Sequence, residues 1–258
     1  MAARIEIRNV SKIFQSRQRA AAEVHAFGPV DLVVEPGSFV SFLGPSGCGK
    51  STLLLMIAGL LAPSSGEILI DGDAVGAPRT DIGIMFQDNT LVPWRSVRGN
   101  VELQLELRGL DPAAYSERTA NLLQTVGLQA FAGNAPYELS GGMQQRAAFC
   151  QALVHEPETL LLDEPLGKLD AMTREGIRRD LQVLWMERRP TVGLVTHSID
   201  EAVQLSSRIC VITPRPGRIH SVIDVDLPWP RDLEVRKSRA FAEYSAAIHD
   251  VFHGFGVL

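Results

Sequence analysis

The chain has 258 residues, of which 45% are apolar and 21% charged, a composition typical of a soluble globular protein. Its formal net charge of −5 argues against a nucleic-acid binder, because such proteins usually carry a basic surplus. The longest apolar run, residues 53–62, is far too short to span a bilayer, and the N-terminus lacks the apolar core of a secretory signal. Three widely separated cysteines without metal-ligand spacing indicate reduced thiols in a cytosolic protein.

The first third of the chain alternates strand and helix patterns. Ile5 and Ile7 alternate with polar residues, as in a half-buried strand. The apolar run 39–43 predicts a buried strand that ends at Gly44, and residues 53–61 predict a helix packed against it. Two further strands are predicted at residues 67–72 and 82–86.

The pattern becomes helical after Pro93 and stays so from 97 to about 154, with Asp111-Pro112 as a helix cap and first-turn proline. Strand patterns then return at residues 160–163, 192–197 and 208–213, and residues 214–217 predict a turn. The tail from Asp232 predicts one or two surface helices. We therefore predict a single α/β domain over residues 1–258 with an inserted helical subdomain. Its parts are a core of 1–92 and 157–224, the insert at 93–156 and a helical tail at 225–258.

A glycine-rich stretch between the second predicted strand and its helix matches the pattern G-x-x-x-x-G-K-[ST]. Glycines let backbone N–H groups wrap phosphates, and the positive end of the following helix points at the same charge. Lys50 would neutralise phosphate oxygens, and the Ser51 hydroxyl would ligate Mg²⁺. The predicted ATP-binding residues are Gly44, Pro45, Ser46, Gly47, Cys48, Gly49, Lys50, Ser51 and Thr52.

The predicted strand 160–163 ends in two consecutive acids, Asp163 and Glu164. Asp163 fits the carboxylate that orients Mg²⁺, and Glu164 could polarise the water that attacks the γ-phosphate. The structural alternative is a buried strand that ends in two solvated acids. Beside a phosphate-binding loop, the catalytic interpretation is favoured.

A second glycine-rich segment, LSGGMQQR at 139–146, begins another predicted helix and contains no catalytic nucleophile. Ser140, Gly141 and Gly142 would offer an anion a hydroxyl, backbone N–H groups and a positive helix end. The structural alternative is a helix cap with a tight glycine contact.

The five motifs together, in this order, resemble the ATP-binding cassette ATPases over residues 4–220: GPSGCGKST, Gln87, LSGGMQQR, LLLDEP and His197. Within that family the chain looks like the ATPase subunit of nitrate, sulfonate and taurine importers, with weaker support from residues 88–94, 196–203 and 213–219. The resemblance implies a P-loop cassette with a mixed β-sheet core. It also implies a homodimer in which the two subunits are arranged head to tail, so that each of two ATP molecules is bound between both chains. The residues facing the partner's ATP would be Leu139, Ser140, Gly141, Gly142 and Gln144.

The resemblance assigns roles to four other positions. Gln87 would sense Mg²⁺ and the attacking water, so that the expected Mg²⁺ ligands are Ser51, Gln87 and Asp163. His197 would contact the γ-phosphate and hold Glu164 or the water. Phe14 would stack on adenine, with a core phenylalanine as the alternative, and Asp170 would lie in the loop that crosses the dimer interface. For Gln87 and His197 the alternatives are a polar loop residue and a structural histidine.

Three positions depart from the family pattern: Lys168 where a small residue is usual, Gln151 where many relatives have arginine, and Ser38 where an acid is common. None of them removes a catalytic group, but each could tune the rate or the dimer contacts. Lys168 could strengthen nucleotide-driven closure or simply point to water.

The function implied is hydrolysis of Mg·ATP to drive an importer from the cytoplasmic face of the cell membrane. Expected partners are two integral-membrane permease subunits and an extracytoplasmic substrate-binding protein, without nucleic acid. The apolar stretch Leu91–Trp94 is either a groove for a permease helix or a small core that holds the insert. The rival functions are a soluble cassette ATPase of DNA repair or translation and the ATPase of a non-transport membrane complex.

Overall fold

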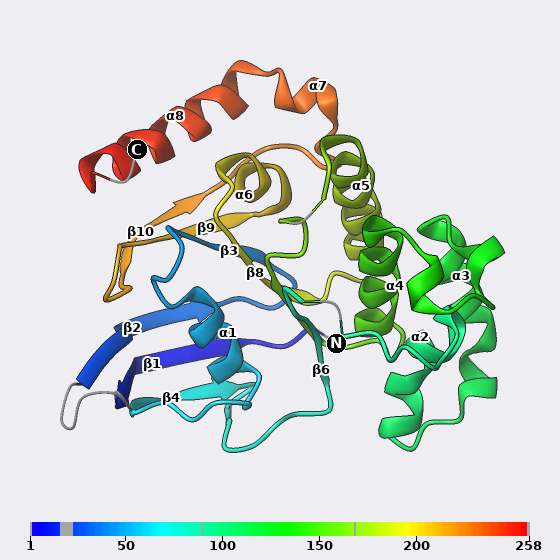
Figure 1. Cartoon of the computed structure of the whole chain (residues 1–258). Helices are drawn as coiled ribbons and strands as arrows, with labels where there is room; N and C mark the ends of the chain where they lie inside the picture. Colours follow the sequence, from blue (N-terminus) through cyan, green and yellow to red (C-terminus); the bar gives the residue numbers. More distant parts are fainter. Residues whose placement is uncertain (1, 16–22, 89, 168, 257–258) are drawn as a thin grey trace. The chain divides into compact units, whose positions relative to one another are not determined.

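A computed structural model describes residues 2–15, 23–88, 90–167 and 169–256. The chain forms two compact units, one of Met1–Arg79 with Arg189–Leu258 and the other of Thr80–Arg188 (Figure 1). The second unit is larger than the helical insert predicted at 93–156, because it also contains two strands and a long helix. Among the described residues, the helices are all too short or too polar to cross a membrane.

The first unit contains an antiparallel sheet in the order β2-β1-β4-β5. The alternation predicted for Ile5 and Ile7 is confirmed, since both side chains are buried on one face of β1. β1 pairs with β2 through Ile5 and Val34 and with β4 through Ile5 and Ile70. The strands are β1 (Ile5–Gln15), β2 (Glu23–Val34), β4 (Ser65–Ile70) and β5 (Asp73–Ala74).

A second group of strands in this unit is mixed, because β3 runs parallel to both β8 and β9 whereas β10 is antiparallel to β9. All five side chains of β3 are buried, as expected for a strand with neighbours on both edges. The strands are β3 (Phe39–Leu43), β8 (Thr191–Thr196), β9 (Arg208–Ile212) and β10 (Ile219–Asp224). The helices of the unit are α1 (Lys50–Ile57), α6 (Ile199–Leu205), α7 (Leu233–Arg236) and α8 (Arg239–Gly254).

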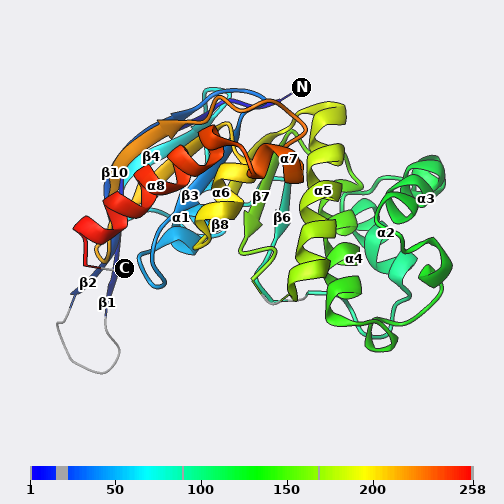
Figure 2. The ribbon, with the colours of Figure 1, turned by 90° about the horizontal axis from the view of Figure 1, so that it is seen from above.

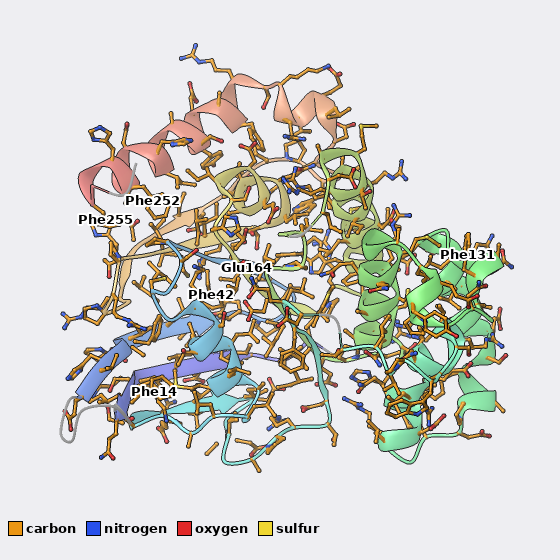
Figure 3. All side chains as sticks on the ribbon, viewed as in Figure 1. Phe14, Phe42, Phe131, Glu164, Phe252 and Phe255 are labelled. Carbon is orange, nitrogen blue, oxygen red and sulfur yellow. The ribbon has the colours of Figure 1, made fainter. Side chains whose placement is uncertain are left out.

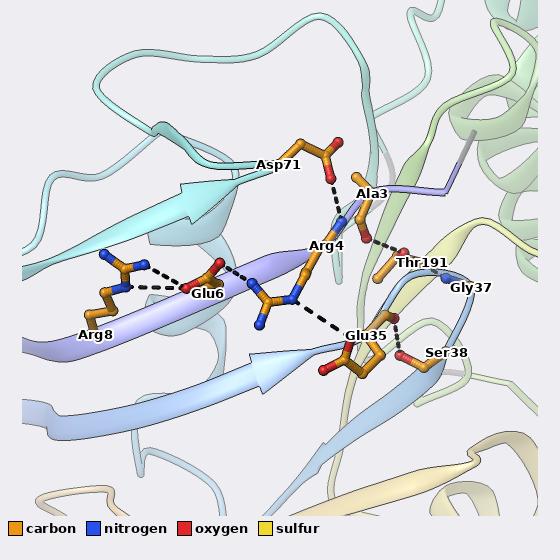
Figure 4. A network of polar contacts seen from close by, with 9 residues as sticks. All are labelled: Ala3, Arg4, Glu6, Arg8, Glu35, Gly37, Ser38, Asp71 and Thr191. Carbon is orange, nitrogen blue, oxygen red and sulfur yellow. Dashed lines mark hydrogen bonds and ion pairs between the residues drawn. The ribbon is translucent and has the colours of Figure 1, made fainter.

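A polar network ties the start of β1 to neighbouring segments of the first unit (Figure 4). The backbone N–H of Arg4 donates to Asp71 Oδ1 at 2.7 Å, and the Thr191 hydroxyl donates to the carbonyl of Ala3. Arg8 hydrogen-bonds Glu6 on the same strand and thereby lowers the pKa of that carboxyl. The N-terminal strand is therefore held at one end to both groups of strands.

Nearby, Ser38 Oγ donates to the carbonyl of Glu35 at 2.5 Å, so this departure from the family pattern stabilises a turn before β3.

The second unit contains two parallel strands and four helices of seven or more residues, counted over its described part. The predicted cap is confirmed: Asp111 Oδ1 accepts from the N–H of Ala113 at 3.0 Å, with Pro112 at the first helical position of a short 3-10 helix. The strands are β6 (Ile82–Met85) and β7 (Thr159–Asp163), and the helices are α2 (Val97–Leu107), α3 (Ser116–Thr125), α4 (Gly141–Leu153) and α5 (Ala171–Arg188). Short 3-10 helices cover Pro112–Tyr115, Gln129–Phe131 and Pro136–Glu138.

Candidate active site

The phosphate-binding loop of the first unit joins β3 to α1 and requires glycine for backbone reasons. Gly47 and Gly49 have φ of 77° and 100°, in the left-handed region that L side chains rarely adopt. A Cβ atom on Gly49 would lie 2.5 Å from the carbonyl oxygen of Ala26, so only glycine fits there. Two left-handed residues in so short a loop turn successive N–H groups to one side, which forms an anion-binding concavity.

Helix α1 begins at this loop with Gly49 as its N-cap, and no side chain caps its first N–H groups. No acidic residue lies in its first turn either. Since a helix N-terminus carries a partial positive charge, α1 presents that charge to an anion without neutralisation by a carboxylate of the first turn. The cradle therefore fits the phosphates of a nucleotide.

Lys50 is the first residue of α1 and is only 4% exposed. Its ammonium donates to the carbonyl oxygens of Gly44 and Pro45, both at 2.8 Å. These bonds hold the cation against the first residues of the loop. Ser51 and Thr52 follow Lys50 in the first turn of the helix.

In the second unit, β7 ends at the predicted acid pair. Asp163 is 8% exposed, and Glu164 has a φ of 44°, which is strained for a residue with a side chain. The Gln87 amide donates to Glu164 Oε2 at 3.0 Å, so the structure brings two of the predicted catalytic residues together. Figure 3 labels Glu164 at this position.

Two residues that sequence reasoning missed hold the segment after Glu164. Gln145 on α4 is buried and donates to the carbonyl of Pro165 at 2.7 Å. Arg174 on α5 donates to the carbonyls of Leu166 and Leu169. Gln145 lies inside the LSGGMQQR segment, and this position in the motif is the feature of the sequence that could have identified it as a site residue.

The signature segment of the second unit begins α4, as predicted. Ser140 is the N-cap, and its Oγ accepts from the N–H of Met143 at 3.3 Å. A Cβ on Gly142 would lie 2.5 Å from Thr173 Cγ2 of α5, which explains this glycine by packing. A Cβ on Gly141 would meet nothing within 4 Å. The alternative interpretation, a helix cap with a tight glycine contact, therefore explains Ser140 and Gly142 but not Gly141.

Other predicted residues of this segment are held by the backbone. The Gln144 amide donates to the carbonyl of Pro136 at 2.7 Å and to that of Leu139 at 3.3 Å, and Leu139 is buried. Asp170 Oδ1 accepts from the N–H of Met172 and of Thr173 at the start of α5. The hydrogen bonds from Thr173 lower the pKa of Asp170. The ionised carboxylate therefore stabilises the start of α5 fully at any pH above the ordinary pKa of aspartate. This stabilisation is lost as the pH falls through the lowered pKa of Asp170.

His197 lies between β8 and α6 in the first unit and is exposed. It lines a pocket of about 320 Å³ together with Gly44 and Pro45 of the phosphate-binding loop. The rest of the lining comes from the N-cap and first turn of α6 and from α8: Ser198, Ile199, Asp200, His249 and Phe252. The first residues of the loop and His197 therefore share one cavity.

Phe14 lies near the end of β1 with 40% of its surface exposed (Figure 3), so it is not a core residue. The Lys12 ammonium lies 5.3 Å from its ring centroid. A flat ring at the surface beside a cation suits stacking on a base.

Of the three departures from the family pattern, Lys168 lies outside the described residues. Gln151 is buried on α4, and its amide donates to the carbonyl of Asn100 on α2 at 2.9 Å.

A pocket of about 530 Å³ in the second unit is lined in part by Pro93 and Trp94, the last two residues of the apolar stretch after Gln87. Trp94 is 83% exposed and Tyr137 78% exposed, so neither belongs to a core that would hold the insert. The buried Asn100 side chain, missed from the sequence, accepts from the N–H of Val92 and donates to the carbonyls of Val92, Arg95 and Ser96. The pocket is lined by Pro93, Trp94, Arg95, Ser96, Gly133, Ala135 and Tyr137.

The predicted Mg²⁺ ligands, Ser51, Gln87 and Asp163, offer a hydroxyl, an amide and one carboxylate. Within the part of the chain that the structure describes, no three His, Cys, Asp or Glu side chains gather into a metal-binding group. Mg²⁺ is usually held by one or two carboxylates together with substrate phosphates, so this donor set fits Mg²⁺ bound with a nucleotide.

A mixed α/β sheet, a phosphate-binding loop and an acid pair at a strand end define a P-loop nucleotide hydrolase. The family model described as "ABC transporter" matches residues 27–167. The chain belongs to the ATP-binding cassette transporter family and is an ATPase, which confirms the resemblance and the fold class predicted from the motifs.

Relatives of nearly equal length support this assignment. A taurine import ATP-binding protein of Jannaschia sp. is 44% identical over 245 residues, covering 93% of this chain and 90% of that protein. An aliphatic sulfonates import ATP-binding protein of Bacillus cereus is 39% identical over 254 residues, covering 98% of each. A solved dimeric ATP-binding cassette in a post-hydrolysis state, bound to ADP and Pi, matches with a TM-score of 0.75 at 32% identity, covering 86% of this chain and 98% of that one.

Proposed function

We propose that this chain hydrolyses Mg·ATP as the ATPase subunit of an importer for taurine, a sulfonate, nitrate or a similar small solute. It acts as a homodimer on the cytoplasmic face of the membrane, with two permease subunits and an extracytoplasmic substrate-binding protein. The similarity to taurine and sulfonate import proteins supports the solute class. The dimeric structure with ADP and Pi supports the dimer.

The roles of the side chains follow from their chemistry. Lys50 and the N–H groups of α1 neutralise the phosphates, while Glu164 polarises the attacking water and His197 contacts the γ-phosphate. Mg²⁺ supplies charge neutralisation on the phosphate oxygens when it is bound with ATP. No covalent intermediate is needed, because positioning and charge account for most of phosphoryl-transfer catalysis. The observation that carries the proposal is the start of α1, which has neither a side-chain cap nor a first-turn acid.

We expect Glu164→Gln to bind ATP but to turn over at least about 100-fold more slowly, the scale of a lost positioned base. ATP should then shift the variant from monomer to dimer in light scattering, since closure persists without hydrolysis. Glu117→Gln, on the exposed start of α3, is the matched control and should hydrolyse ATP normally. Near-normal turnover by purified Glu164→Gln would contradict the role of Glu164.

We also propose that the pocket around Trp94 receives a short cytoplasmic helix of a permease subunit. Two exposed aromatic rings on a preformed apolar surface suit a helix-in-groove contact. Asn100 fixes the loop that carries Trp94, so the groove is preorganised and loses little entropy when a helix docks. Because this loop directly follows Gln87, nucleotide binding could bias the transporter between two states.

Trp94→Ala should keep the basal ATPase activity of the isolated subunit but lose stimulation by, and co-purification with, the permease. The reason is that Trp94 contacts the partner and not the nucleotide. Leu107→Ala, which removes a side chain that is 70% exposed outside the groove, is the control and should retain both properties. If Trp94→Ala loses basal activity as well, Trp94 supports the fold of the subunit; if both assays are unchanged, the groove proposal is wrong.

A further inference from the structure

The C-terminal tail of the first unit is built onto α6, the helix that directly follows His197. α8 lies beside α6 (Figure 2), and Phe241, Ile248 and Phe252 of α8 pack into one apolar cluster with α6. The same cluster contains Leu43, the last residue of β3 before the phosphate-binding loop. The tail therefore packs against the supports of both His197 and the loop.

A buried arginine fastens the tail to the C-terminal end of α6. Arg231 is 1% exposed, and its guanidinium donates to the carbonyls of Val203 and Ser206 at 2.7 and 2.6 Å. It also donates to the carbonyls of Val225 and Leu227, so the one guanidinium group joins the end of α6 to the segment that leads into the tail helices. A cation at the last carbonyls of a helix is favoured by the helix dipole.

The opposite end of α6 is held as well. Arg236 of α7 lies 3.6 Å from the carboxylate of Asp200, in the first turn of α6. Asp200 lines the same pocket as His197, and so do His249 and Phe252 of α8. The tail thus contacts α6 at both ends and forms part of the wall around His197.

A helix of seven residues is too short to be stable alone, so the position of α6 depends on what packs against it. Only Ser198, its N-cap, separates α6 from His197. A displacement of α6 would therefore also move the backbone of His197, because one residue connects them.

We propose that Arg231 and the tail helices α7 and α8 are positioning elements for His197, holding it in the geometry that ATP hydrolysis requires. The proposal rests on the proposed role of His197. It assigns to residues 225–254 a part in catalysis that they perform without touching the nucleotide.

The test compares Arg231→Lys, which keeps the charge but cannot reach all the carbonyls, with Arg239→Ala, which removes a 92% exposed arginine of α8. We expect Arg231→Lys to lower kcat about 10-fold with little change in the KM for ATP, the scale of a small misplacement of a catalytic group. The imidazole resonance of His197, identified by its loss in His197→Ala, should shift in Arg231→Lys and stay in place in Arg239→Ala.

Circular dichroism establishes that each variant is folded. If Arg231→Lys does not fold, Arg236→Ala replaces it, with an expected loss in kcat of about 3-fold, the scale of a partly exposed ion pair. An unmoved His197 resonance in the folded variant overturns the proposal. Full activity of His197→Ala instead contradicts the role of His197, and the resonance still reports whether the tail positions this side chain.

Discussion

Gly141 and Gly142 are neighbours in the sequence, but they need to be glycine for different reasons. Gly142 is required by α5, because a Cβ there would overlap Thr173. Gly141 faces open space, so packing within the chain does not explain it. The sequence motif shows both glycines alike, and only the coordinates separate the glycine with an internal contact from the glycine that faces open space.

Phe14→Ala should raise the KM for ATP about 3- to 10-fold with an unchanged kcat, because loss of one aromatic stack costs about 0.5–1.5 kcal/mol of binding. The matched control is Phe131→Ala, since Phe131 is 39% exposed against 40% for Phe14 but belongs to the other unit. Steady-state kinetics at varied ATP concentration measures the effect. An equal change in both variants would show that Phe14 does not stack on adenine.

Elements with one clear periodicity could be predicted from the sequence, whereas those with a mixed pattern could not. The runs at 39–43 and 160–163 were predicted because every residue of their strands, β3 and β7, is buried. β2 was missed because Gly28-Pro29 interrupts its alternation. α5 was missed because it buries Arg178, Asp180 and Gln182, which hide its apolar stripe.

The predicted site residues followed from motif spacing, but their supports did not. Gln145 acts through a hydrogen bond to a backbone carbonyl 20 residues away in the sequence, and Asn100 acts through several hydrogen bonds to the backbone of residues 92–96. Such bonds leave no periodic pattern, because the partner is an atom that every residue has. Supports of this kind could be found only from coordinates.

Asn100→Ala should lower the unfolding midpoint by about 5–10 °C, because the loss of a buried hydrogen-bonding partner for the backbone costs about 2–3 kcal/mol in total, and each kcal/mol shifts the midpoint by about 2–4 °C. Thermal unfolding followed by circular dichroism gives the midpoint. Asn121→Ala, at an exposed position on α3, should leave it unchanged. A small effect of Asn100→Ala would mean that water replaces the amide and that the groove loop is held by other contacts.

At the scale of the whole molecule, the phosphate-binding loop belongs to one compact unit and the signature helix α4 to the other. The sequence identified both motifs but does not determine whether one chain or two complete an active site. The proposed homodimer makes this a question of symmetry, since a two-fold axis would present the signature segment of each chain to the ATP of its partner.

Mixing two inactive variants tests this arrangement. Ser140→Arg blocks the signature segment, and Lys50→Ala removes the phosphate-binding cation, so neither should hydrolyse ATP alone. Their heterodimer contains one site with an intact loop and an intact signature segment, and we expect ATPase activity to return in the mixture. Normal hydrolysis by Ser140→Arg alone would exclude the shared site.

The exposure of Trp94 also has an optical consequence. The chain contains three tryptophans. Trp185 is 4% exposed, and Trp229 is half-buried with the Arg231 guanidinium 4.2 Å from its ring. Trp94 is thus the indole that water and a quencher such as acrylamide reach most easily. The long-wavelength part of the intrinsic fluorescence therefore originates mainly from the groove, and a helix that covers Trp94 would shift it to shorter wavelength without any attached label.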